Sequence, residues 1–253
     1  MEVIICENPE EVVVRGFQTV KKQVERLTEP VLGLATGATM EPLYALMRGL
    51  DLSASTTFNL DEYVGLGPDH PCSYAAYMEK HLFSHTKVRK FHLLNGLTED
   101  IPQHCQDYEQ AIKEAGGLDL QLLGIGSDGH IAFNEPGSSL SSRTRLKILT
   151  SMTREANSKH FPPGEDVPKY VLTMGVGTVM EARHCLLLAY GQSKARAVAG
   201  AIEGGVSAFC PASILQMHPR CTMIVDEAAA SLLKLKDYYR NVYENKPEWM
   251  NSQ

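Results

Sequence analysis

The stretch LDLQLLGIGSDGHIAFNEPGSS (residues 118–139) decides which fold the sequence predicts. Its apolar run, LDLQLLGIG, ends at glycines, and Asp128, His130 and Glu135 follow within eight positions. A short apolar run bounded by turn residues is typical of a buried strand in a parallel sheet. The ionisable residues therefore follow directly after the end of the predicted strand.

Similar apolar runs occur on both sides of this stretch and alternate with helical patterns. A helix is predicted to begin at Asn8 and Pro9, since Asn favours the N-cap and Pro the first turn. The alternation predicts an α/β fold with a mostly parallel sheet and helices on both faces. We find no linker or repeat, so one domain over residues 1–253 is expected. The predicted strands are VIIC (3–6), VLGLA (31–35), TTFNL (56–60), FHLL (91–94), LDLQLLGIG (118–126), RLKILT (145–150), KYVLTMGV (169–176), CLLLAYG (185–191) and CTMIVDE (221–227).

Composition excludes several classes of protein. The net charge is −6 and no run is rich in Lys or Arg, which argues against nucleic-acid binding. No apolar segment reaches the roughly 20 residues of a membrane span, and the N-terminus does not have the pattern of a signal peptide. The six cysteines are scattered without a CxxC pair, which is typical of reduced thiols in a cytoplasmic protein.

In parallel sheets the ligand binds beyond the carboxyl ends of the strands, so these ends carry the candidate site. The loop Thr36, Gly37, Ala38 and Thr39 can wrap backbone N–H groups around a phosphate, although an ordinary turn would have the same composition. It lacks the GK[ST] of a nucleotide P-loop. Asp61, at the end of FNLD, has the position of a general base, although a solvated acidic loop is the alternative.

The glycines of GIGSDG match GxGxxG, but their context does not fit a dinucleotide site. That site needs a helix directly after the glycines and an acid at the end of the next strand. Here Pro136 and Gly137 break the helix, and RLKILT ends without an acid. Asp128, His130 and Glu135 remain, and a carboxylate beside an imidazole makes a proton shuttle near neutral pH.

Two other clusters have metal-ligand spacing but lack partners. His81 and His85 are separated by one helical turn, and His218 lies near Cys221, yet no third ligand accompanies either pair. We predict no metal and no cofactor. Lys159 and Lys194 could meet a phosphate, although a solvated charge is the usual role of a lysine.

The motifs ATGAT, FNLDEYVGL with HPCSY, GIGSDGHIAFNEPGSSLSSRTR and VPKYVLTMGVGT resemble, in this order, the glucosamine-6-phosphate deaminase family. The resemblance extends over about residues 30–225 and implies a Rossmann-like fold. It implies that glucosamine 6-phosphate and water become fructose 6-phosphate and ammonia by coupled isomerisation and deamination, without a metal or organic cofactor.

The resemblance also implies roles for individual residues. Asp61 would move a proton from C2 to C1 of the sugar, and His130 would open the ring with the support of Asp128 and Glu135. The phosphate would be held by Thr36, Gly37, Ala38, Thr39, Lys194 and Lys159. Lys159 stands where the family has an Arg, and Lys lacks the bidentate grip of Arg on a phosphate.

Some bacterial members of the family are hexamers activated by N-acetylglucosamine 6-phosphate at a subunit interface. Ser138, Arg145 and Lys147 match part of that allosteric site, whereas Ile148 stands where a Thr is usual. A homo-oligomer is therefore a possible assembly.

Three alternatives share this fold. One is a deaminase of another aminosugar phosphate, such as galactosamine 6-phosphate. Another is a hydrolase like 6-phosphogluconolactonase, which would not need Asp61 as a carbon base. The third is a non-catalytic sugar-phosphate sensor, which would have no use for Asp61, Asp128, His130 and Glu135 together.

Overall fold

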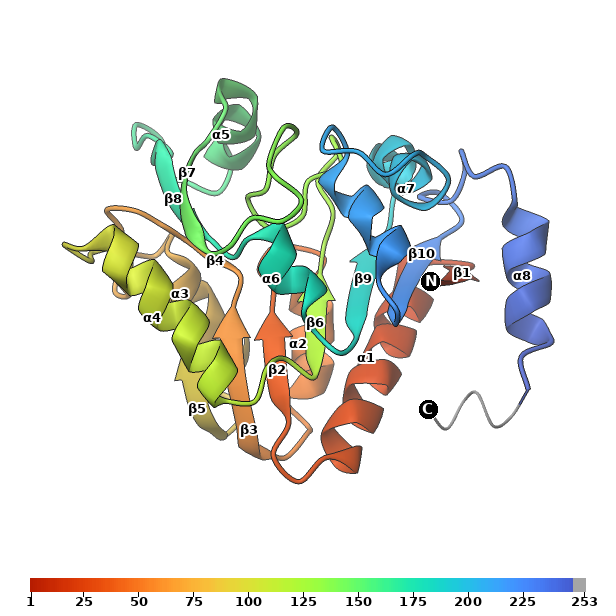
Figure 1. Cartoon of the computed structure of the whole chain (residues 1–253), viewed down its shortest axis with the longest axis horizontal. Coiled ribbons are helices and arrows are strands. Elements are labelled where there is room, and N and C mark those ends of the chain that lie inside the picture. Colours follow the sequence, from red (N-terminus) through yellow and green to blue (C-terminus); the bar gives the residue numbers. More distant parts are fainter. Residues whose placement is uncertain (248–253) are drawn as a thin grey trace.

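The computed structural model describes residues 1–247 and contains a seven-stranded sheet in which every strand pair is parallel (Figure 1). The predicted α/β class with a mostly parallel sheet is confirmed. In spatial order the strands are β1 (Glu2–Cys6), β10 (Cys221–Asp226), β9 (Cys185–Ala189), β6 (Leu120–Leu123), β2 (Val31–Leu34), β3 (Leu52–Asn59) and β5 (Val88–His92).

Helices pack around this sheet, and local sequence explains where they begin. The longest, α1 (Pro9–Arg26), begins as predicted: the side chain of Asn8 accepts a hydrogen bond from the backbone N–H of Glu11 at 2.9 Å. No helix within residues 1–247 is long and apolar enough to cross a membrane. The other helices are α2 (Glu41–Met47), α3 (Tyr74–Met78), the π-helix η1 (Glu79–Phe83), α4 (Ile101–Glu114), α5 (Ser151–Ser158), α6 (Val176–Met180), the 3₁₀-helix η2 (Gln192–Lys194), α7 (Ala195–Ile202), the 3₁₀-helix η3 (Pro211–Met217) and α8 (Lys236–Glu244).

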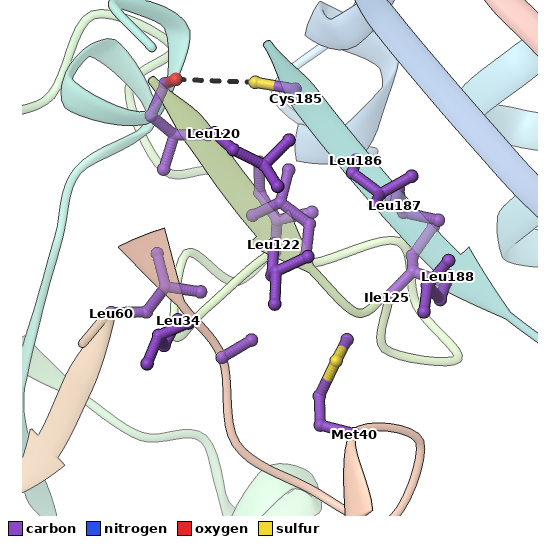
Figure 2. Packing of buried hydrophobic residues seen from close by; sticks show 14 of the residues in the cluster. Leu34, Met40, Leu60, Leu120, Leu122, Ile125, Cys185, Leu186, Leu187 and Leu188 are labelled. Carbon is purple, nitrogen blue, oxygen red and sulfur yellow. Dashed lines mark hydrogen bonds between the residues drawn. The ribbon is translucent and has the colours of Figure 1, made fainter. Parts of the chain in front are cut away.

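The core lies against the central strands β6 and β9, whose residues are buried on both faces of the sheet (Figure 2). Leu120, Leu122, Leu186 and Leu188 are at most 1% exposed. Continuous apolar runs therefore mark these strands, as expected where helices cover both faces of a sheet.

The prediction that RLKILT and KYVLTMGV continue the parallel sheet is wrong. They form β7 (Arg145–Ile148) and β8 (Tyr170–Thr173), which pair antiparallel with each other, and β8 pairs antiparallel with β4 (Asp61–Tyr63) in a separate three-stranded sheet. The burial of β7 alternates along the strand, and such half-exposed strands are typical of antiparallel sheets. FHLL also extends past its strand, since β5 ends at His92.

Candidate active site

The candidate site lies at the carboxyl ends of the adjacent strands β6, β2 and β3. Parallel pairing places these ends at one edge of the sheet, as the connections in Figure 1 show. Asp128 and His130 lie in the loop after β6, Thr36–Thr39 lie in the loop after β2, and Asp61 is the first residue of β4, two residues after the end of β3. The topology therefore brings together the sequence segments predicted for catalysis and phosphate binding.

His130 and Asp128 form a close pair. Nδ1 of His130 lies 2.6 Å from Oδ1 of Asp128, and the backbone N–H of His130 donates to the same oxygen at 3.2 Å. Burial raises the pKa of Asp128, but the hydrogen bonds from His130 outweigh it, so the pKa lies below its ordinary value. A carboxylate 2.6 Å from Nδ1 favours the tautomer with the proton on Nδ1, which leaves Nε2 free to accept one.

The glycines around this pair are required by close packing. A Cβ at Gly126 would lie 2.2 Å from Cε1 of His130, so the imidazole occupies the space that a side chain would need. Gly129 has a φ of +89° and packs against Sγ of Cys210. Ala132, two residues after His130, is the one non-glycine residue within 1–247 with positive φ, at +49°. This loop is strained in the way that functional sites often are.

Asp61 and Glu62 are both buried, but their carboxylates have different surroundings. Glu62 accepts hydrogen bonds from the backbone N–H groups of Tyr63, Tyr74 and Ala75 at 2.8 to 3.0 Å, and so caps α3. The side chain of Asp61 makes no hydrogen bond or ion pair within residues 1–247 and is 7% exposed. Burial, and then the negative charge of Glu62, raise the pKa of Asp61 to about 8.

Glu135 reaches α5 rather than His130. Its carboxylate accepts hydrogen bonds from the backbone N–H of Thr150 at 3.2 Å and from the hydroxyls of Thr150 and Thr153. No hydrogen bond joins Glu135 to His130 in the part of the chain that the structure describes. Among residues 1–247 the imidazole therefore has one carboxylate partner, Asp128, and Glu135 instead ties the loop that carries His130 to the start of α5.

The loop Thr36–Thr39 is an open turn. Gly37 has a φ of +110°, and no atom of residues 1–247 lies within 4 Å of a Cβ built on it, so the turn leaves space above its backbone. Tyr77 donates to the carbonyl of Gly37 at 2.9 Å, and Tyr190 donates to that of Ala38 at 3.4 Å. These tyrosines hold the carbonyls and leave the N–H groups of the turn available to a ligand.

The two candidate phosphate-binding lysines come from different elements. Lys194 is the last residue of η2, directly before α7, and its Nζ donates to the carbonyl of Ile125 at 2.7 Å. Burial lowers the pKa of Lys194, and the positive charge of Lys159 lowers it further, whereas the negative charge of Asp128 raises it. The pKa lies below its ordinary value. Lys159 is exposed and follows the last turn of α5. The two cations are therefore close enough to repel each other.

The three candidate allosteric residues occupy two places. Arg145 and Lys147 lie two residues apart on β7, so they share one face of this edge strand. Ser138 is buried, 3% exposed, and its hydroxyl has no hydrogen-bond partner within residues 1–247. No hydrogen bond joins Ser138 to either cation in the same residues.

Several residues of the site were not found from the sequence. Of the two residues that bind Glu135, Thr150 was predicted to be the last residue of the strand RLKILT (145–150), and Thr153 lies three residues beyond it, in α5. Tyr63 accepts a hydrogen bond from Asn157 of α5 at 3.0 Å. The spacing of Tyr74 and Tyr77 within HPCSYAAY was an available signal, because it places both on one face of α3.

Comparisons with known proteins show the family to which the chain belongs. The family model for glucosamine-6-phosphate isomerases/6-phosphogluconolactonase matches residues 8–224. The glucosamine-6-phosphate deaminases of Arthrobacter sp. and Rhodococcus opacus are 50% and 47% identical to the chain, over 98% and 99% of its length and 99% and 100% of theirs.

Solved structures show the same relationship. A monomeric glucosamine-6-phosphate deaminase has a TM-score of 0.88 at 40% identity and covers 92% of this chain and 100% of its own. The 6-phosphogluconolactonase from Trypanosoma cruzi has a TM-score of 0.75 at 20% identity, over 92% of this chain and 97% of its own, a similarity of fold alone. The chain therefore belongs to the glucosamine-6-phosphate isomerase/6-phosphogluconolactonase family.

Proposed function

We propose that this protein is a glucosamine-6-phosphate deaminase, which converts glucosamine 6-phosphate and water to fructose 6-phosphate and ammonia. The observation that carries the proposal is the carboxylate of Asp61, buried and without a partner among residues 1–247, at the sheet edge that also carries the His130–Asp128 pair. Relatives of the same length, up to 50% identical, bear this name, which supports the same reaction. A carbon base and an imidazole shuttle are the two groups that this chemistry needs.

Ring opening is the first step and is assigned to His130. The proton of the O1 hydroxyl must reach the ring oxygen O5, so one group has to accept a proton and return it nearby. With Asp128 holding the proton on Nδ1, Nε2 of His130 can do both. Glu135, bound to Thr150 and Thr153, would support this step by fixing the loop that carries the imidazole.

Isomerisation and deamination follow from Asp61. Its carboxylate removes the proton from C2 of the open chain to give an enolamine, and returns a proton to C1 to give the imine at C2. Water then adds to C2 and ammonia leaves, which yields the ketone of fructose 6-phosphate. A base whose pKa is raised toward the working pH binds and releases a proton readily, which suits such a transfer.

The phosphate is assigned to Thr36, Gly37, Ala38 and Thr39 with Lys194 and Lys159. The open backbone of the turn supplies N–H donors, and the mutual repulsion of the two lysines would be relieved by a bound dianion. The net charge of −6 makes such a local concentration of donors and cations necessary for an anionic substrate.

Assembly, regulation and location form the remaining part of the proposal. Residues 1–253 would form one isomerase/deaminase domain, of which 248–253 lie outside the described residues. The edge strand β7, with Arg145 and Lys147 on one face and Ser138 in the preceding loop, would be the regulatory contact of a homo-oligomer. The six free cysteines support a reducing compartment and hence the cytoplasm.

The decisive experiment is an assay of ammonia release with glucosamine 6-phosphate and galactosamine 6-phosphate run in parallel. We expect release from the gluco epimer and its loss in Asp61→Asn, while Asp69→Asn, in the exposed loop after β4, keeps full activity. Release from the galacto epimer alone would preserve the mechanism and change the substrate. Release from neither would refute the proposal.

A further inference from the structure

The structure brings together three side chains that the proposed reaction does not use. His70 and Cys72 lie in the loop between β4 and α3, and Glu165 lies in the segment between α5 and β8. One potential ligand atom of each, an imidazole nitrogen, the thiol sulfur and a carboxylate oxygen, lies within 4.8 Å of the other two. Nε2 of His70 is 2.9 Å from Oε1 of Glu165.

The sequence alone predicts no metal, but the tertiary structure assembles this cluster, and from it we propose that His70, Cys72 and Glu165 form a binding site for a divalent transition-metal ion of the zinc class. Imidazole, thiolate and carboxylate are the three ligand types that zinc takes in proteins, and three protein ligands leave the fourth tetrahedral position to water. The thiolate selects against magnesium and calcium, which prefer oxygen. His70 and Cys72 are partly buried and Glu165 is exposed, so an ion can enter from solvent.

Proton balance sets the pH dependence of this site. In the metal-free protein Nε2 of His70 carries its proton toward Glu165, and Nδ1 accepts a 3.2 Å hydrogen bond from the backbone N–H of Cys72. The metal takes Nε2, the imidazole proton moves through solvent to Nδ1, and the hydrogen bond from Cys72 is given up. The thiol, which donates a 3.4 Å hydrogen bond to the carbonyl of His160, loses its proton to solvent. One proton is released per ion bound, and no redox change occurs.

A bound metal ion would link two loops of the protein. An ion held here ties the loop before α3, a helix whose first two backbone N–H groups donate to Glu62, to the segment that follows α5 and Lys159. Because the ligands come from segments far apart in the sequence, binding should also stabilise the folded chain.

The test is a cobalt titration of the purified full-length protein under a non-chelating reductant. We expect a thiolate-to-cobalt charge-transfer absorption that saturates at one equivalent, with one proton released, and that zinc displaces. Cys72→Ser should abolish the absorption, and Glu165→Gln should weaken cobalt binding about tenfold or more. The matched control is Cys210→Ser, since Cys210 is the other partly exposed cysteine, and it should leave the absorption unchanged.

A thermal melt gives a second, independent reading. Zinc should raise the Tm of the wild type and of Cys210→Ser, but not that of Cys72→Ser. No cobalt absorption in the wild type, or an absorption that survives in Cys72→Ser, would overturn the proposal. Neither reading depends on catalysis, so a protein without deaminase activity would give the same answer about the metal site.

Discussion

The carboxylate of Asp61 affects stability as well as reactivity. Its pKa of about 8 is above its ordinary value of 3.8, so the folded state keeps a proton between these pH values that the unfolded chain releases. Stability should therefore fall as pH rises from about 4 to 8, and this loss persists at higher pH. Asp61→Asn, which cannot ionise, should remove a penalty on the order of a few kcal/mol at pH 8 and almost none at pH 4.

Thermal melts of both proteins across this range test the sign of the effect. A Tm difference that grows with pH is expected, together with loss of ammonia release in the variant. A variant that is less stable than the wild type at pH 8 would show that the carboxylate has a stabilising partner after all.

Gly126 is required by the ring of His130. A Cβ at this position would lie 2.2 Å from the imidazole, so Gly126→Ala should push the ring away from Asp128 and misplace the proton shuttle. We expect kcat/KM for ammonia release to fall by about 10²- to 10⁴-fold, the usual contribution of a positioned acid–base group. Gly205→Ala is the control, because no atom of the described residues 1–247 lies within 4 Å of a Cβ at this position, and its effect should be small.

Replacing Lys159 by Arg should increase the affinity for the phosphate of the substrate. Arg in its place can hold a phosphate with two parallel hydrogen bonds, so Lys159→Arg should lower KM about three- to tenfold. Because the phosphate is bound equally in the ground and transition states, kcat should stay unchanged. Steady-state kinetics measure this effect, with Lys169→Arg as the control, because Lys169 is another exposed lysine of the segment after α5. Equal KM values in the two variants would show that Lys159 does not bind the phosphate.

At the scale of elements, Glu109 joins three of them. From α4 its Oε1 accepts hydrogen bonds from the N–H and hydroxyl of Thr144, which precedes β7, and from the hydroxyl of Thr178 in α6. Arg143 pairs with its Oε2. Burial raises the pKa of Glu109, but these hydrogen bonds and the charge of Arg143 outweigh it and lower the pKa below its ordinary value.

A group with a lowered pKa stabilises the fold above its unfolded pKa, and this contribution is lost as pH falls through the folded pKa. Glu109→Gln should therefore cost about 1–3 kcal/mol of unfolding free energy at pH 7 and much less below pH 4. Urea titrations at both pH values measure the free energy of unfolding and test this, with Glu114→Gln, at an exposed position of the same helix, as the control. Equal losses at both pH values would assign the effect to shape rather than charge.

At the scale of the whole molecule, burial predicts an order of local stability. Every residue of β6 and β9 is buried, whereas α5 buries only Thr153 and α8 buries none of its residues. Amide hydrogen exchange should be slowest in β6 and β9 and fastest in α5 and α8, because segments with few buried contacts open locally. Protection in α5 equal to that in β9 would contradict this and would indicate a second partner for the helix.

What the sequence determined by itself was local. The apolar runs identified β6 and β9, Asn8 and Pro9 identified the start of α1, and the strand ends directed attention to the candidate site. A strand that is buried on both faces has a continuous apolar sequence, and an N-cap is recognised from a few neighbouring residues. Both features can therefore be inferred without knowledge of distant contacts.

Only the tertiary structure decided which distant strands and side chains contact one another. It separated β7 and β8 into an antiparallel sheet, joined Glu135 to Thr150 and Thr153, and brought Glu165 to His70. Each of these depends on how loops return distant segments to one place. A strand's pattern reports how deeply it is buried but does not identify its neighbour, and a carboxylate's sequence position does not identify its hydrogen-bond donor.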